Sequence, residues 1–168
     1  PHPLLAACVT LGGIGYAVPG TVLALALLSP LVLIDDGLNW LTYSLFGVTV
    51  GLVIAGSGAA VVTAYVIRFL AISIGFAQAG FARISTDFDD VARSLGAGPG
   101  QVVRTVHWPL AGPALWGAAL LIFVDCLKEL PATLLLRPLN VETLSTYIYQ
   151  FATRGSFEEG SLAALLIV

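Results

Sequence analysis

The sequence has little charge: only 10% of its 168 residues are Asp, Glu, Lys or Arg, against about 25% in an ordinary soluble domain. Hydrophobic residues make up 58% of the chain. A soluble fold of this size has too small an interior to hide so much apolar surface from water. The composition therefore excludes a water-soluble domain and favours a protein that lies in a lipid bilayer.

Cysteine and basic residues are also scarce. The two cysteines, Cys8 and Cys126, both lie in apolar runs and have the spacing of neither a metal site nor a disulfide framework. We predict that they are small buried apolar side chains. The net charge of −3 excludes a basic surface for nucleic acid. No catalytic triad, cofactor motif or metal-ligand set is evident, so we do not expect an enzyme.

Long apolar runs dominate what the sequence does contain. The first two, Leu4 to Ile34 and Leu41 to Ile67, exceed the roughly 20 residues that a helix needs to cross a membrane. A third covers Thr105 to Val124, and a fourth begins at Ser161 and is cut short by the end of the sequence. We predict an all-α polytopic transmembrane helical bundle, and we interpret residues 1–168 as part of one transmembrane domain of a longer protein.

The polar segments between these runs predict an orientation. The stretch from the second to the third run holds four of the seven basic residues, which places it in the cytoplasm by the positive-inside rule; they are Arg68, Arg83, Arg93 and Arg104. A turn at Asp35 and Asp36 and the polar stretch Arg137 to Glu159 are then expected outside. Glycines within the first two runs are expected to let neighbouring helices approach closely.

The cytoplasmic stretch has the features of two short helices joined by a glycine-rich elbow. Ser85 and its neighbours are N-cap candidates, Gly96 is a plausible helix stop, and Pro99 suits the first turn of a second helix. Asp89 and Arg93 have the i, i+4 spacing of an ion pair. We expect both helices to lie at the cytoplasmic surface.

This stretch resembles the EAA motif of ABC importer permeases, which is Glu-Ala-Ala, three residues, Gly, nine residues and Ile-x-Leu-Pro. Here Asp90-Val91-Ala92 precedes Gly96 by the same three residues, and Val106-His107-Trp108-Pro109 follows after nine. Asp, Val, Val and Trp replace four motif residues. The resemblance implies a type I ABC importer permease fold, with a coupling loop at about residues 84–109 that docks on a separate ATP-hydrolysing subunit. Its implied coupling residues are Asp90, Val91, Ala92, Gly96, Val106 and Pro109.

Two further segments, Tyr16 to Thr21 and Leu127 to Pro138, resemble parts of ferric-iron ABC importer permeases. This resemblance implies import of ferric iron across a bacterial cytoplasmic (inner) membrane. The implied partners are an extracytoplasmic substrate-binding protein, an ABC ATPase subunit and a second permease half or subunit. A permease for another small solute, such as thiamine, spermidine or an anion, and a non-transport membrane scaffold remain alternatives.

A charged cluster near the end of the third run contains Asp125, Lys128 and Glu129, followed by Pro131. Charges at membrane depth are rare and usually face a protein interior or a cavity, and Pro131 should end or kink the helix. Lys128 is spaced to pair with either acid. The cluster is either a structural ion cluster or part of a translocation path. Because the local ligands are too few for a stable iron site, we expect it to contact the cargo weakly.

Overall fold

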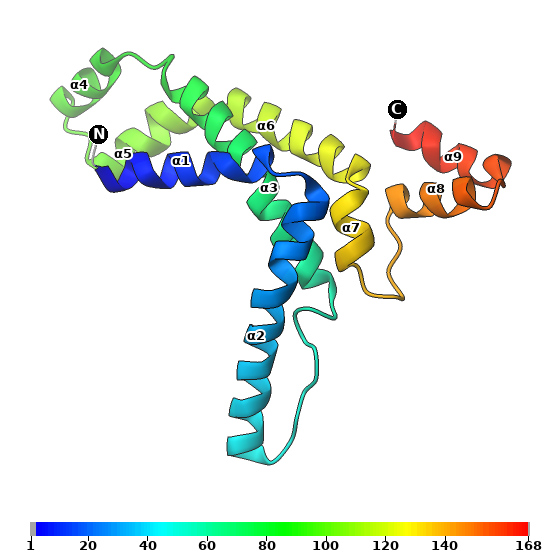
Figure 1. Ribbon diagram of the computed structural model, residues 1–168. Coiled ribbons are helices and arrows are strands. Elements are labelled where there is room, and N and C mark those ends of the chain that lie inside the picture. Colours follow the sequence, from blue (N-terminus) through cyan, green and yellow to red (C-terminus); the bar gives the residue numbers. More distant parts are fainter. Residues whose placement is uncertain (1–2, 168) are drawn as a thin grey trace.

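The computed structural model describes residues 3–167, apart from the side chain of Leu5, and that part of the chain contains helices and connecting segments but no strand. The prediction of an all-α fold is confirmed. Figure 1 labels the helices α1 (Pro3–Ala17), α2 (Gly20–Phe46), α3 (Gly58–Phe81), α4 (Thr86–Ser94), α5 (Pro99–Val102), α6 (Trp108–Lys128), α7 (Pro131–Leu136), α8 (Leu144–Thr153) and α9 (Phe157–Ile167).

Three helical segments are long and apolar enough to cross a membrane: Gly20–Phe46, Gly58–Phe81 and Pro99–Lys128. The third is continuous because a π-helical turn, Val103–His107, joins α5 to α6. The predicted second short helix at the cytoplasmic surface is therefore wrong, since α5 is the first turn of this span. The polytopic arrangement itself is confirmed.

The first apolar run is broken where a single kinked span was expected. α1 ends at Ala17 and α2 begins at Gly20. Pro19 has no N–H to donate and disfavours a helical backbone at Val18. The kink predicted at Pro19 is therefore a full interruption, which leaves the carbonyl of Val18 without a helical partner.

The turn predicted at Asp35 and Asp36 does not exist, because α2 continues through both residues to Phe46. The chain reverses instead over residues 47–57, with positive φ angles of 69° at Gly47 and 75° at Gly51. These two glycines lie in that connection and make its turns. The expectation that they let neighbouring helices pack closely is wrong for these two positions.

Asp35 explains why the reversal comes so late. Its buried carboxylate accepts hydrogen bonds from the backbone N–H groups of Val53 (3.1 Å), Ile54 (2.8 Å) and Ala55 (2.8 Å). One turn further along α2, the side-chain oxygen of Asn39 accepts from the N–H groups of residues 50 and 51. Asp35 and Asn39 thus supply the partners that an extended connection lacks, and they hold it along α2.

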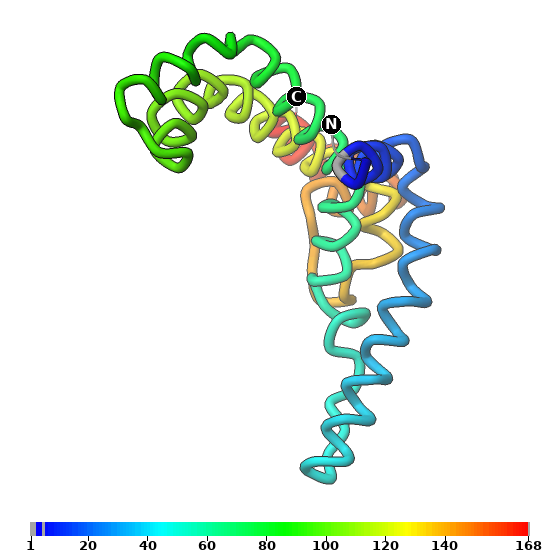
Figure 2. The backbone as a smooth tube through the Cα atoms, turned by 90° about the vertical axis from the view of Figure 1, so that its left-hand side faces the viewer, coloured from blue at the N-terminus to red at the C-terminus, as the bar shows by residue number. Residues whose placement is uncertain are grey.

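Helix α3 extends to Phe81, well beyond the predicted end of the second span. Arg68 consequently lies inside this helix and not in the cytoplasmic stretch. Figures 1 and 2 both show α6 lying beside the C-terminal half of α3, whereas α2 projects away from this pair. The positive charge that predicts a cytoplasmic location for the following stretch is then that of the other three arginines, Arg83, Arg93 and Arg104.

Glycines bring α1 and α3 into close contact. A Cβ atom at Gly15 would overlap the carbonyl oxygen of Ile67, and one at Gly12 would overlap the side chain of Ile74. The close packing expected of the first-run glycines is confirmed at these two positions. Such contacts suit helices that associate in lipid, where small residues let backbones approach.

The C-terminal part of the chain forms the helical hairpin of α8 and α9. α8 lies within the polar stretch Arg137 to Glu159, for which the sequence analysis made no helix prediction. α9 begins at Phe157, before the fourth apolar run that starts at Ser161. Near the hairpin, Arg137 pairs with Glu142 at 2.6 Å. A hydrogen bond from Arg137 holds the pKa of the Glu142 carboxyl below its ordinary value.

The role of Asp35 can be tested with its neighbour as the control. Asp35→Asn presents an amide N–H₂ to a backbone donor, so we expect a lower free energy of unfolding by about 1–3 kcal/mol. Asp36, which is exposed on the same helix, should tolerate the same change. Thermal unfolding of the two variants in detergent would measure the difference, and equal stabilities would contradict the role assigned to Asp35.

Candidate functional site

Arg68 connects two interruptions in the helices. Its Nη1 donates a hydrogen bond to the carbonyl oxygen of Val18 at 2.8 Å, in the break between α1 and α2. Its Nε lies 3.1 Å from Oε2 of Glu129, in the break between α6 and α7. The second break is the helix end that Pro131 predicted. A single side chain from the middle of α3 therefore joins both breaks.

The Arg68–Glu129 contact is shielded from water. The side chains are 19% and 8% exposed, respectively. The buried Arg68 Nε makes no hydrogen bond within the described part of the chain, so its contact with Glu129 is an ion pair without hydrogen-bond alignment. The guanidinium also lies 5.9 Å from the ring centre of Tyr16, at cation–π distance. Removal of either charge would leave the other poorly compensated.

Glu129 is held by groups from several helices. Its backbone carbonyl accepts hydrogen bonds from the hydroxyls of Thr133 (2.6 Å) and Ser145 (3.0 Å). Its Oε1 accepts the N–H of Ala132 at 3.3 Å. A Cβ atom at Gly20 would lie 2.5 Å from the same oxygen, so the carboxylate sits at the N-terminus of α2, where the helix dipole favours negative charge.

A small cavity of about 150 Å³ opens beside this ion pair. Its charged lining residues have both signs, and two aromatic side chains complete it; the lining consists of Tyr16, Arg68, Phe69, Asp125, Lys128 and Glu129. The structure thus brings together the three charged residues that the sequence singled out. It adds Arg68, whose position as an isolated charge between apolar segments was the available signal.

The expected partner of Lys128 is not observed. Within the described residues, Lys128 has no carboxylate oxygen within 4.0 Å, and the ion partner of Glu129 is Arg68. The i, i+4 rule considered neighbours on one helix and could not anticipate a partner from α3. Lys128 and Asp125 therefore face the cavity with their charges available.

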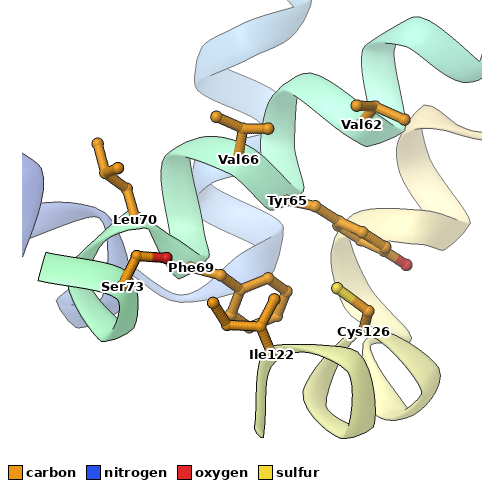
Figure 3. Close-up of a pocket in the computed structure, with 8 residues that line it drawn as sticks. All are labelled: Val62, Tyr65, Val66, Phe69, Leu70, Ser73, Ile122 and Cys126. Atoms are coloured by element: carbon orange, nitrogen blue, oxygen red, sulfur yellow. The ribbon is translucent and has the colours of Figure 1, made fainter. Parts of the chain in front are cut away.

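A second, apolar pocket of about 300 Å³ lies between α3 and α6 (Figure 3). Cys126 lines it and is partly buried, whereas Cys8 is exposed, which contradicts the predicted burial of Cys8. At its edge, the hydroxyl of Tyr65 lies 2.6 Å from that of Thr133. The apolar lining offers no charged group to a polar solute. The described residues also contain no group of three or more His, Cys, Asp or Glu side chains that could hold a metal ion.

Helix α4 is capped at both ends as its sequence predicts. The hydroxyl oxygen of Ser85 accepts the N–H of Asp87. At the other end Gly96 has a φ of +85°, its N–H donates to the carbonyl of Arg93, and the N–H of Ala97 donates to that of Ala92. This pair of bonds ends a helix when a glycine adopts the left-handed conformation.

The outward side of α4 is apolar and uncovered. Phe88, Val91 and Leu95 are 51%, 58% and 82% exposed, and no residue of α4 is buried. Their spacing of i, i+3 and i+7 places them on one face of the helix. Asp90 and Gly96 are also exposed, while Ala92 is half-buried.

The other residues of the predicted motif lie in the continuous helix that follows. Val106 belongs to the π-turn and is half-buried, and Pro109 is exposed in the first turn of α6. Pro109 cannot donate to the carbonyl of Thr105 and would crowd it in an α-helix. The wider π-turn immediately before it relieves that conflict.

Asp89 makes a different contact from the predicted pair with Arg93. Its Oδ1 lies 2.8 Å from Nε2 of His107, on the π-turn. The ring of His107 also lies 5.8 Å from that of Phe81, the last residue of α3. The segment between α3 and α6 therefore folds back, so that α4 contacts the π-turn that leads into α6.

No known family profile matches this chain, but individual proteins do. The putative 2-aminoethylphosphonate transport system permease protein PhnV of Salmonella typhimurium is 33% identical over 64% of this chain and 41% of its own length. The Fe(3+)-transport system permease protein FbpB 2 of Haemophilus influenzae is 28% identical over 91% of this chain and 27% of its own length. The trehalose transport system permease protein SugB of Mycobacterium tuberculosis is 36% identical over 62% of this chain and 39% of its own length.

The chain thus spans about two fifths or less of the length of these relatives. These relatives are inner-membrane permeases, and their names state different cargoes. This chain has helices that can span such a membrane. The three relatives share the description as permease proteins but differ in the cargo that they are named for. The chain is therefore similar, in its sequence and in its apolar helices, to the inner-membrane permeases of ABC transporters, which agrees with the resemblance of residues 84–109.

Proposed function

We propose that this chain is part of the permease of an ATP-driven importer, and that residues 84–109 are the coupling loop of a single permease domain. ATP hydrolysis takes place on a separate ATPase subunit. The observation that carries the proposal is the apolar stripe of α4, which is uncovered and yet held in a capped helix. An amphipathic helix of this kind suits docking into a groove on a partner.

The coupling residues have distinct parts in this docking. Val91 lies on the apolar stripe, and the exposed Asp90 offers a charge to the rim of the groove. Gly96 ends the helix and lets the chain turn close to the partner. Val106 and Pro109 support the loop from the start of the span that follows.

The cavity beside Arg68 and Glu129 is our candidate for a gate in the translocation path. The ion pair ties the α1–α2 break to the α6–α7 break, so the breaks can separate only when it opens. Asp125 and Lys128 present charges of both signs to the cavity. Such a lining suits brief contact with a charged cargo, which must also leave.

Ferric iron is the cargo that the resemblance implies, and the extent of the match to FbpB 2 supports it, since that relative aligns with 91% of this chain. The described residues hold no cluster of metal ligands, so iron affinity is expected on an extracytoplasmic binding protein. A small charged organic solute is the second candidate. The two cationic and two acidic residues of the cavity favour it, as does the higher identity, 33%, to the 2-aminoethylphosphonate permease.

The orientation proposed from sequence is retained with altered boundaries. Arg83, Arg93 and Arg104 still concentrate positive charge around the coupling loop, which favours the cytoplasm for that loop. The connection 47–57 replaces the Asp35–Asp36 turn as the outer reversal. The connection 137–143 also lies outside in this arrangement, whereas α8 turns back toward the α6–α7 break, where Ser145 contacts Glu129.

Docking can be tested at the end of α4. Gly96→Leu forces a β-carbon into a left-handed conformation, which costs roughly 1 kcal/mol or more, so we expect loss of the ATPase subunit or of transport while the spans still insert. Gly98→Leu is the control, because Gly98 has an ordinary φ of −73° and a Cβ added there would meet no atom within 4 Å. Co-purification of the ATPase and uptake into vesicles measure the outcome. Normal ATPase retention and uptake in Gly96→Leu would rule out this docking site.

The gate can be tested by neutralising its charges. Glu129→Gln leaves Arg68 uncompensated, so we expect lower uptake per folded complex, some loss of folded protein and an unchanged affinity of the binding protein for its cargo. Lys128→Gln should lower uptake with little loss of folded protein, because Lys128 is exposed and unpaired among the described residues. Uptake of labelled ferric iron and of 2-aminoethylphosphonate into reconstituted vesicles gives both the rate and the cargo. Unchanged uptake per complex in both variants would leave a purely structural ion cluster.

The orientation can be tested with single cysteines in a background in which Cys8 and Cys126 are replaced by Ala. A cysteine at Val50 should react with a membrane-impermeant thiol reagent in intact cells, because it lies in the proposed outer connection. A cysteine at Arg93 should react only after the membrane is permeabilised. The opposite pattern would reverse the proposed topology.

A further inference from the structure

His107 stands where the coupling loop joins the two spans that flank it. It is the last residue of the π-turn that leads into α6, its Nε2 contacts Asp89 on α4, and its ring faces Phe81 at the end of α3. Within the described residues, the Asp89–His107 contact is the one polar side-chain interaction between α4 and another helix. α4 also packs against α5, but this contact is its one side-chain hydrogen bond to the base of the following span within the described residues.

The covalent connection between α4 and α6 is compliant. It passes through Gly96, Ala97 and Gly98 and then through the π-turn. Glycine permits many backbone conformations, and π-turns are points where helices kink. A displacement of α4 could be absorbed in this segment before it reached α6. The 2.8 Å contact from Asp89 to His107 bypasses the segment and bears directly on the base of α6.

The opposite end of α6 leads directly into the candidate gate. The helix is 21 residues long, or about 31 Å at 1.5 Å per residue. The residue that follows it is Glu129, which pairs with Arg68. α6 thus has a polar contact at each end, one to the coupling helix and one to the pair that joins the two helix breaks.

We propose that the Asp89–His107 contact is the mechanical link that transmits movement of α4 to α6, and through α6 to the Arg68–Glu129 pair. This inference rests on the proposed function, because it requires that a partner move α4. Asp89 and His107 are positioning residues in this scheme: they fix α4 relative to α6 and do not contact cargo. Both are about three-quarters covered, at 27% and 24% exposed, so the link is partly shielded from competing water.

The experiment uses the full-length permease reconstituted in vesicles with its ATPase and binding protein. His107→Leu and Asp89→Leu remove the link, whereas His107→Gln retains a side-chain donor that can reach Asp89. Asp36→Asn and Arg83→Gln are controls, because they remove exposed charges outside residues 84–109 whose side chains make no hydrogen bond or ion pair with the described residues. The measured quantities are ATPase retention, ATPase activity, and cargo taken up per ATP hydrolysed.

If the link transmits movement, both Leu variants keep the ATPase subunit and its activity but take up roughly 5- to 10-fold less cargo per ATP, the scale of a typical coupling free energy. The double variant should be no worse than either single one, because each removes the same contact. His107→Gln and the two controls should remain within about twofold of the parent protein.

Two outcomes would overturn the inference. Unchanged uptake per ATP in the Leu variants would show that movement reaches α6 without the link. Loss of the ATPase subunit in those variants would show that the contact only maintains the docking surface. Failure of the parent permease to retain an ATPase would instead refute the proposed function, which keeps the two conclusions separate.

Discussion

A backbone group inside a membrane must find a hydrogen-bond partner within the protein, because the hydrocarbon offers none. Two prolines interrupt helices in this chain, Pro19 and Pro131, and each interruption exposes carbonyl groups. Arg68 supplies the donor for Val18 at the first break, and hydroxyl groups supply donors for Glu129 at the second. The remaining charge of Arg68 then requires the carboxylate of Glu129. The packing of the helices around this point follows from that requirement.

The same residues that stabilise the two helix breaks also lie where the helices can move relative to each other. The breaks are places where helices can change direction, and in the proposed gate the ion pair determines whether they do so together. A chain of pairwise contacts leads from there along α6 to the coupling loop. At that end the tight contact between α3 and α6, where Gly80 faces Ala111 and Ala114, provides a firm base. The uncovered α4 is the part that a partner can reach.

Local chemistry made several features predictable. Ser85 and Gly96 fix the ends of α4 through interactions with backbone groups a few residues away, so their roles could be inferred from spacing. The close packing at Gly12 and Gly15 was likewise inferred from residue size. By contrast, Asp35 and Asp36 suggested a turn because acidic residues are costly in a bilayer. Nothing local indicates that Asp35 is satisfied by N–H groups 18 to 20 residues away.

The amino-acid sequence alone determined that this is a helical membrane protein, and it predicted a capped cytoplasmic loop that resembles that of ABC permeases, because apolar length, charge bias and helix caps are local properties. It also identified Asp125, Lys128 and Glu129 as unusual, since each is a charge close to an apolar span. Only the tertiary structure decided that Glu129 pairs with Arg68 instead of Lys128, and that Asp89 contacts His107 instead of Arg93. The physical reason is that a polar contact depends on distance in space, and helix packing brings together side chains that lie 61 and 18 residues apart in the chain.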